Sequence, residues 1–135
     1  MIQTSKAIRG IALINCDFEN EERLPFENDF FDVVTALAVF EHIEPRNLGR
    51  LHKEIYRILK ADGMYIMTTP AFWTARLLRF LAELRLIGDI EIKDHKGSYK
   101  HSDILPILQK ADFQKEKMKF GHFEMFMNSW VTATK

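Results

Sequence analysis

The sequence predicts an α/β domain whose sheet is mostly parallel and ends in an antiparallel hairpin. Between residues 31 and 68, a strand-like apolar run, a helix-like run and a second strand-like run follow one another. This order is typical of a right-handed crossover between two parallel strands of one sheet. Residues 115–134 then read as two adjacent strands with a tight connection, which favours a closing hairpin on the sheet edge.

The first two predicted strands lie on either side of an acidic loop. Ile11–Cys16 is a short apolar run that ends at Asp17, and residues 17–28 hold Pro25 and several acids. Phe31–Val39 is rich in valine and is apolar almost without interruption. A continuous rather than alternating apolar pattern predicts a strand that is buried on both faces.

A helix and a third strand follow. Pro45 opens the helix, and apolar side chains then recur at helical spacing. They are Leu48, Leu51, Ile55, Ile58 and Leu59. The ADG stretch is predicted to end the helix, with Gly63 in the left-handed conformation of a C-terminal cap. Met64–Thr68 is the third strand, and Thr69 and Pro70 come directly after it.

The remaining elements are two helices and two strands. Phe72–Ile87 carries a leucine stripe that is typical of an amphipathic helix. Ser102 is a favourable N-cap for a helix over Asp103–Lys110. Lys115–Phe126 and Asn128–Thr134 are the closing strands. Since no repeat, low-complexity tract or linker divides the chain, all 135 residues are expected to form a single domain.

Composition excludes several classes of function. With 47% apolar and 28% charged residues, the chain is typical of globular proteins. Nineteen basic residues balance nineteen acidic ones, so no overall field attracts nucleic acid or an anionic membrane. Three arginines within residues 71–90 exclude an ordinary membrane helix there. Cys16 is the only cysteine, which excludes a disulfide framework and predicts a reducing, cytoplasmic location.

A series of short motifs then resembles a known family. A strand ending in Asp17 is followed by LPF, FDVV, EHI, EIYRILKADG and TTP, in this order. The series resembles class I S-adenosylmethionine-dependent methyltransferases, and most of all their small-molecule branch called type 11. The likeness is specific over residues 11–70 and weaker in DHKGSYKHSDILPILQKADF and NSWVTATK. It implies a Rossmann-like sheet, S-adenosylmethionine as cofactor, and methyl transfer to a small-molecule acceptor.

The resemblance also implies roles for single residues. Asp17 would accept a hydrogen bond from the adenine amino group, with the Phe18 backbone beside the ring. Leu37 and Ala38 would approach the methionine part of the cofactor. His42 would lie near the sulfonium and the substrate entrance, and Glu41 or His42 would serve as general base.

Simpler roles remain open for the same residues. Asp17 is also typical of a turn, and Glu41 and His42 are compatible with capping the next helix. Independently of the family, the ends of parallel strands meet at one edge of a sheet, where ligands bind. Asp17, Glu41-His42 and Thr68–Pro70 are therefore expected on one rim.

The N-terminal part of the family pattern has no counterpart here. Only ten residues precede Ile11, and Gly10 is the only glycine among them, so the glycine-rich turn and the strands around it are missing. Lost contacts to the ribose and the glycine loop amount to roughly 4–6 kcal/mol, which weakens binding about a thousandfold. We therefore expect this truncated chain to bind cofactor weakly or not at all when isolated. A gene-start error, a frameshift or a split gene would explain such a remainder.

The missing strands would also leave Phe31–Val39 with a bare edge. Either the strand at Ile11 moves across to fill the gap, or a second copy or a complementing chain pairs there. The alternatives to a methyltransferase that acts as this chain alone are a non-catalytic interaction module with the methyltransferase fold, or one half of a split enzyme.

A last group of residues allows two interpretations. The group reads as a substrate lid or phosphate-tolerant patch, or more simply as a solvated loop. It consists of Asp94, His95, Tyr99, Lys100 and His101. Its spacing matches no metal-ligand signature, so no metal is predicted. Phe72 and Trp73 either line a hydrophobic substrate pocket or pack in the core, and Cys16 is expected to be a small buried hydrophobe.

Overall fold

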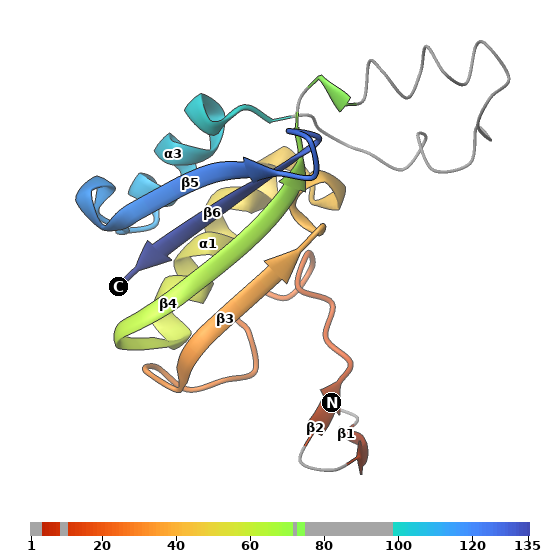
Figure 1. Cartoon of the computed structure of the whole chain (residues 1–135). Coiled ribbons are helices and arrows are strands. Elements are labelled where there is room, and N and C mark those ends of the chain that lie inside the picture. The colour runs from red at the N-terminus through yellow and green to blue at the C-terminus, as the bar shows by residue number, and fades with distance from the viewer. Residues whose placement is uncertain (1–3, 9–10, 72, 75–98) are drawn as a thin grey trace, which may run out of the picture.

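The computed structural model describes residues 4–8, 11–71, 73–74 and 99–135 (Figure 1). The helix predicted over Phe72–Ile87 lies almost entirely outside these residues. No helix of the described part is long and apolar enough to cross a membrane.

The main sheet has four strands in the order β3-β4-β6-β5. They are β3 (Phe31–Leu37), β4 (Leu59–Pro70), β5 (Met118–Phe123) and β6 (Asn128–Thr134). β3 and β4 are parallel, while β6 is antiparallel to both β4 and β5. Three of the four strands therefore point the same way, which confirms the predicted α/β sheet with its C-terminal antiparallel hairpin.

Two helices lie on one face of this sheet. α1 (Pro45–Ile58) connects β3 to β4, and α3 (His101–Lys110) precedes a short 3₁₀ turn, η2 (Lys115–Lys117), before β5. Figure 1 shows both helices behind the sheet. The side chains of α1 that were predicted from helical spacing are buried against β4, as the strand–helix–strand pattern requires. Alternate residues of β4, among them Tyr65 and Met67, face the helices and are about 1% exposed or less.

A buried polar pair lies inside this core. The His52 Nδ1–H donates to the Leu48 carbonyl at 2.7 Å, so the unprotonated Nε2 accepts from the Tyr65 hydroxyl at 3.2 Å. Burial lowers the pKa of His52 to about 4 and raises the pKa of Tyr65. Both groups are therefore neutral at pH 7, and each has a hydrogen-bond partner, as buried polar groups require.

The end of α1 differs from its prediction. The helix ends at Ile58, and β4 begins at once with Leu59, so the ADG stretch lies in the strand. Asp62, not Gly63, has the left-handed conformation, with φ of 62°. Gly63 is needed for space instead, because a Cβ there would lie 2.8 Å from the Lys60 carbonyl oxygen. The prediction of a glycine cap was wrong because glycine is also required where two backbone segments approach closely, and Gly63 serves that second role.

The start of α3 also differs. The helix begins at His101 with Lys100 as N-cap, so Ser102 lies inside the first turn. The Asp103 carboxylate accepts a hydrogen bond from the Lys100 backbone N–H at 2.9 Å. The side chain at the third helical position therefore caps the helix, as in one half of a capping box.

The N-terminal strands form a separate hairpin. β1 (Thr4–Ile8) and β2 (Ile11–Ile14) pair antiparallel in a two-stranded sheet of their own. Figure 1 shows this hairpin apart from the main sheet. Of the two alternatives for the gap beside Phe31–Val39, the one in which the strand at Ile11 fills it was therefore wrong. Pairing with a sequence neighbour closes a very short loop, which costs less entropy than pairing across the acidic segment.

β3 is consequently the edge of the main sheet, and its burial differs from the prediction. Val34 and Ala36 are half-buried towards the helices, whereas Val33 is 50% and Leu37 58% exposed. The expected burial of both faces was wrong because no described element covers the second face. Within the described part of one chain, only the apolar side chains on the helix side of this strand are thus covered.

Candidate functional site

The carboxyl ends of β3 and β4 lie side by side. Leu37 is paired with Thr68, and the Ala38 N–H donates to both the carbonyl and the hydroxyl oxygen of Thr68, each at 3.1 Å. Ala38 has a φ of 52°, in the left-handed region that a residue with a Cβ rarely adopts. The backbone thus turns sharply at the place where Leu37 and Ala38 were predicted to approach a ligand.

The next residues form the short 3₁₀ helix η1 (Phe40–His42). Glu41 is only 3% exposed, and its Oε2 accepts a hydrogen bond from the hydroxyl of the equally buried Thr69 at 3.3 Å. His42 is exposed. The polar residues that follow β3 therefore meet those that end β4 on one rim, as expected, with Glu41 turned inward and His42 available to solvent.

Asp17 begins an exposed turn before the acidic loop. Its carboxylate accepts hydrogen bonds from Asn20, at 3.2 Å from the backbone N–H and 2.7 Å from Nδ2. The side-chain bond from Asn20 lowers the pKa of the Asp17 carboxyl, so the group is ionised at neutral pH. An exposed carboxylate of this kind is an acceptor for an amino group, although Asn20 already occupies part of it.

An apolar groove connects this turn to β3. The groove has a volume of about 420 Å³, and Phe18, Leu24 and Phe26 form one wall. The successive residues 33–36 of β3 form another wall. Because successive strand residues point to opposite faces, a groove that all of them line must follow the free edge of the strand.

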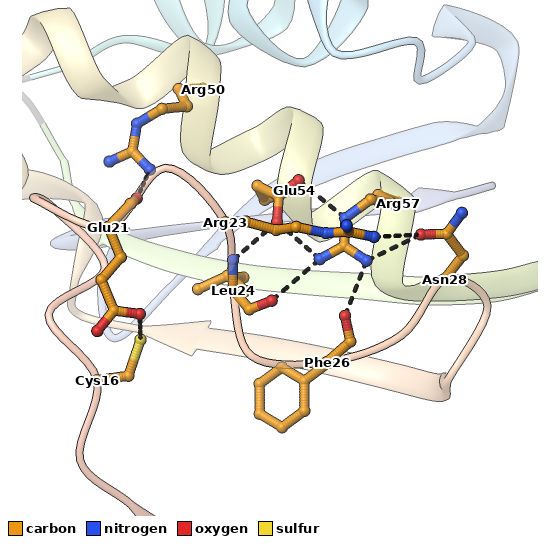
Figure 2. A network of polar contacts seen from close by, with 9 residues as sticks. All are labelled: Cys16, Glu21, Arg23, Leu24, Phe26, Asn28, Arg50, Glu54 and Arg57. Atoms are coloured by element: carbon orange, nitrogen blue, oxygen red, sulfur yellow. Dashed lines mark hydrogen bonds and ion pairs between the residues drawn. The ribbon is translucent and has the colours of Figure 1, made fainter. Parts of the chain in front are cut away.

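Two arginines of α1 hold the acidic loop over the groove. The Arg57 guanidinium binds both carboxylate oxygens of Glu54, at 2.8 and 2.7 Å, and donates to the carbonyls of Phe26 and Leu24 (Figure 2). The Glu54 carboxylate also accepts from the Leu24 N–H at 2.8 Å. Figure 2 shows that this network joins the helix to a loop some thirty residues earlier.

Arg50 fixes the preceding turn. Its guanidinium donates to the carbonyls of Phe18 at 2.7 Å and Glu19 at 2.9 Å, and also to that of Glu21. The Cys16 thiol lies beside this turn, half-buried, and donates to the Glu21 carboxylate at 3.4 Å. Burial raises the pKa of this thiol, with further contributions from Glu21 and Asp17, so the thiol is protonated at neutral pH.

A second hollow, of about 370 Å³, lies at the other end of the rim, between the start of α3 and the β5–β6 connection. Trp73 and Phe126 contribute apolar walls. The rings of His101 and His122 lie 4.8 Å apart, and the Ser129 hydroxyl is hydrogen-bonded to the His122 Nδ1 at 3.2 Å. Burial, and then the neighbouring His122, lower the pKa of His101, which favours a neutral imidazole.

Two polar atoms beside this hollow lack partners in the described structure. They are the Tyr99 hydroxyl and the His101 Nε2, both shielded from solvent. An unpaired buried polar atom is costly, so these two atoms would gain from a hydrogen-bonding ligand in the hollow. No group of three or more His, Cys, Asp or Glu residues in the described part is arranged to hold a metal ion.

The sequence found only part of this hollow. Trp73, Tyr99, Lys100 and His101 line it, while Phe72, Asp94 and His95 lie outside the described residues. His122, Phe126 and Ser129 were missed. His122 and Ser129 flank a turn that contains Phe126. In this turn Glu124, Met125 and Phe126 are all left-handed, and it contains no glycine or asparagine that would signal it in the sequence. The hollow is therefore a product of the hairpin geometry.

Comparison with known proteins indicates the family. Residues 1–67 match a family model described as a methyltransferase domain. Together with the similar proteins below, this match supports a class I S-adenosylmethionine-dependent methyltransferase. It is 27% identical over 114 residues to 2-methyl-6-phytyl-1,4-hydroquinone methyltransferase 2, chloroplastic, from Oryza sativa subsp. japonica, with 84% of this chain and 28% of that protein covered.

Solved structures agree on the fold of this methyltransferase-family chain. A SAM-dependent methyltransferase from Archaeoglobus fulgidus matches with a TM-score of 0.63 and 15% identity, covering 82% of this chain and 62% of that chain. A complex between the Haloferax volcanii Trm112 methyltransferase activator and a methyltransferase matches with a TM-score of 0.68 and 13% identity, covering 96% and 63%. The methyltransferase-family chain thus spans less than a third of the rice protein and under two thirds of these structures.

Proposed function

We propose that this methyltransferase-family chain provides part of a site for S-adenosylmethionine and for a small-molecule methyl acceptor. The observation that carries the proposal is the rim at the carboxyl ends of β3 and β4, where the left-handed turn at Ala38, buried Glu41 and exposed His42 come together. Ligands of open α/β sheets bind at such rims. Methyl transfer from S-adenosylmethionine is the reaction of the family.

The residues present fit one part of this cofactor. Asp17, ionised and exposed, suits the adenine amino group, and Phe18 offers an apolar surface beside the groove. Leu37 and Ala38 present backbone and apolar surface for the methionine part. In the described residues that line the groove, no carboxylate stands ready for the ribose hydroxyls. The fit therefore covers the adenine and methionine ends only.

When bound, S-adenosylmethionine supplies an electrophilic methyl group, and the chain's own residues position the acceptor. His42 is the better-placed general base because it is exposed, whereas Glu41 is buried against Thr69. The hollow beside His101 and His122 suits a small acceptor with an aromatic or apolar body, since the neutral imidazole of His101 can accept a hydrogen bond. The hydroquinone acceptor named for the rice relative is of this chemical kind.

The partial fit implies weak cofactor binding by the isolated chain and a partner at the free edge of β3. A second copy of the chain, or a complementing chain that carries the rest of the cofactor site, would pair with this edge. The Haloferax structure, a methyltransferase in complex with an activator, is an example of a similar fold that has a partner chain. We place the chain in the cytoplasm, because its lone Cys16 suits a reducing compartment.

The test is a calorimetric titration of the chain with S-adenosylhomocysteine at high protein concentration. We expect a Kd near the millimolar range, and a further loss of about tenfold in Asp17→Ala, since one charged hydrogen bond is removed. Glu22→Ala, which removes another exposed acid of the same loop, is the matched control and should bind like the original chain. Equal binding by Asp17→Ala and the original chain would contradict the cofactor assignment.

A second candidate is a non-catalytic interaction module. The free edge of β3 and the engagement of Asp17 by Asn20 favour it, because the first offers a docking surface and the second blocks part of the adenine site. Absence of binding at millimolar ligand, together with a stable dimer or heteromer, would favour this module over the enzyme.

A further inference from the structure

The free edge of β3 combines unpaired backbone groups with exposed apolar side chains. The groove along it is lined by apolar side chains, and Val33 and Leu37 on the open face are at least half exposed. A strand edge flanked by exposed apolar residues is a template for pairing with another strand. The occupant should therefore be an extended apolar segment with a free edge of its own.

The β1–β2 hairpin is such a segment. All four residues of β2 are exposed, with Ile11 at 59%, Leu13 at 52% and Ile14 at 37%. Ile11 and Leu13 lie two residues apart and so project from the same face of the strand. Among the strands of the described residues, β2 pairs only with β1, so its other edge is free of them. The hairpin presents apolar surface that nothing described in its own copy covers.

The charges of the two segments also favour pairing of β2 with the edge of β3. Residues 1–16 contain two basic and no acidic residues, whereas residues 17–32 contain seven acidic residues and one basic residue. The second stretch includes the loop that walls the groove, with Phe18, Leu24 and Phe26 in it. Opposite charges steer the N-terminal segment of one chain towards the groove of another.

We propose that β2 of one copy adds to the free edge of β3 in a second copy, and reciprocally, in a two-fold symmetric dimer. Each groove then receives Ile11 and Leu13 of the other chain, and each free edge gains backbone hydrogen bonds. Exchange of an identical element between two copies closes the assembly at two chains, since both edges are used. This dimer rests on the proposed function in one respect: both assume that a partner pairs with the free edge of β3.

The first experiment is sedimentation velocity of the full chain over a range of concentrations. We expect a reversible dimer whose Kd rises at least tenfold in Val33→Lys and in Leu13→Lys, because each places a charge in the proposed interface, and also rises with salt. Met125→Lys in the β5–β6 turn is the matched control. Met125 is exposed and lies outside the groove, so this variant should dimerise normally.

The second experiment identifies the contact between chains. Leu13→Cys and Thr35→Cys are prepared separately, each with Cys16→Ser, then mixed and treated with a short bismaleimide. A covalent dimer in the mixture, and none from Leu13→Cys or Thr35→Cys alone, supports the exchange. A monomer at every concentration overturns it, as does a dimer that Val33→Lys and Leu13→Lys leave unchanged. A chain with both cysteines that cross-links only within itself also overturns it.

These outcomes are independent of cofactor affinity. A dimer that binds no S-adenosylhomocysteine contradicts the proposed function alone, and a monomer that binds it contradicts the exchange alone. The two proposals can therefore fail separately.

Discussion

The two faces of β4 and β3 differ sharply in how well they are covered. On the helix side, α1 and α3 bury Tyr65 and Met67 almost completely, and the polar pair of His52 and Tyr65 is satisfied inside. On the open side, Val33, Leu37 and Met64 are 40% to 58% exposed although they are just as apolar. The difference teaches that apolar character alone does not fix burial, since a neighbouring element must be there to cover it.

The largest expected difference in stability is between substitutions of two methionines on opposite faces of β4. Met67→Ala should lower the free energy of unfolding by about 3 kcal/mol, because it leaves a cavity in the core. Met64→Ala should lower it by less than about 0.5 kcal/mol, because its side chain is already in solvent. Urea unfolding at a fixed chain concentration measures both. A comparable loss in Met64→Ala would show that a partner covers the open face in solution.

The buried polar pair predicts a pH dependence of similar size. The pKa of His52 is about 4 in the folded chain and near 6.5 when unfolded, so the unfolded state binds more protons between these values. The free energy of unfolding should therefore fall by about 3 kcal/mol as the pH drops from 6.5 to 4. Unfolding series at several pH values test this. His52→Gln should remove most of the slope, and an unchanged slope would contradict the assignment.

The arginine that ties the loop to α1 should contribute more than a surface ion pair. Arg57→Ala should lower the free energy of unfolding by about 2 kcal/mol, because a half-buried bidentate bond to Glu54 and two carbonyl contacts are lost. Lys60→Ala removes the exposed pair with Asp32 and should change the free energy of unfolding far less, because solvent screens that pair. Thermal unfolding distinguishes them. Equal effects would mean that the loop is not held as Figure 2 shows.

The smallest effect concerns the rim. Ala38→Gly should raise the free energy of unfolding by about 0.5 kcal/mol, because relief of the left-handed conformation exceeds the extra entropy of glycine in the unfolded chain. Ala36→Gly, in the regular part of the same strand, should lower it by about 1 kcal/mol. Chemical unfolding of both variants gives the comparison. A loss in Ala38→Gly would contradict the strained turn.

The rim itself could be predicted from sequence because it depends on strand direction. Once β3 and β4 are parallel, their polar ends must meet at one edge, and Glu41 and Thr69 indeed contact each other. The hollow around His122 and Ser129 could not be predicted in this way. It depends on a turn of left-handed residues that carries no usual turn signal.

The sequence by itself determined the α/β class and the βαβ crossover, because periodic apolar patterns act through local geometry, and its short motifs carried the resemblance to the family. Only the tertiary structure decided that Gly63 serves a close approach, that β2 pairs with β1, and that β3 keeps a free edge. Each of these depends on which segments meet in space. A local pattern states that a strand needs neighbours, but packing decides which neighbours it finds.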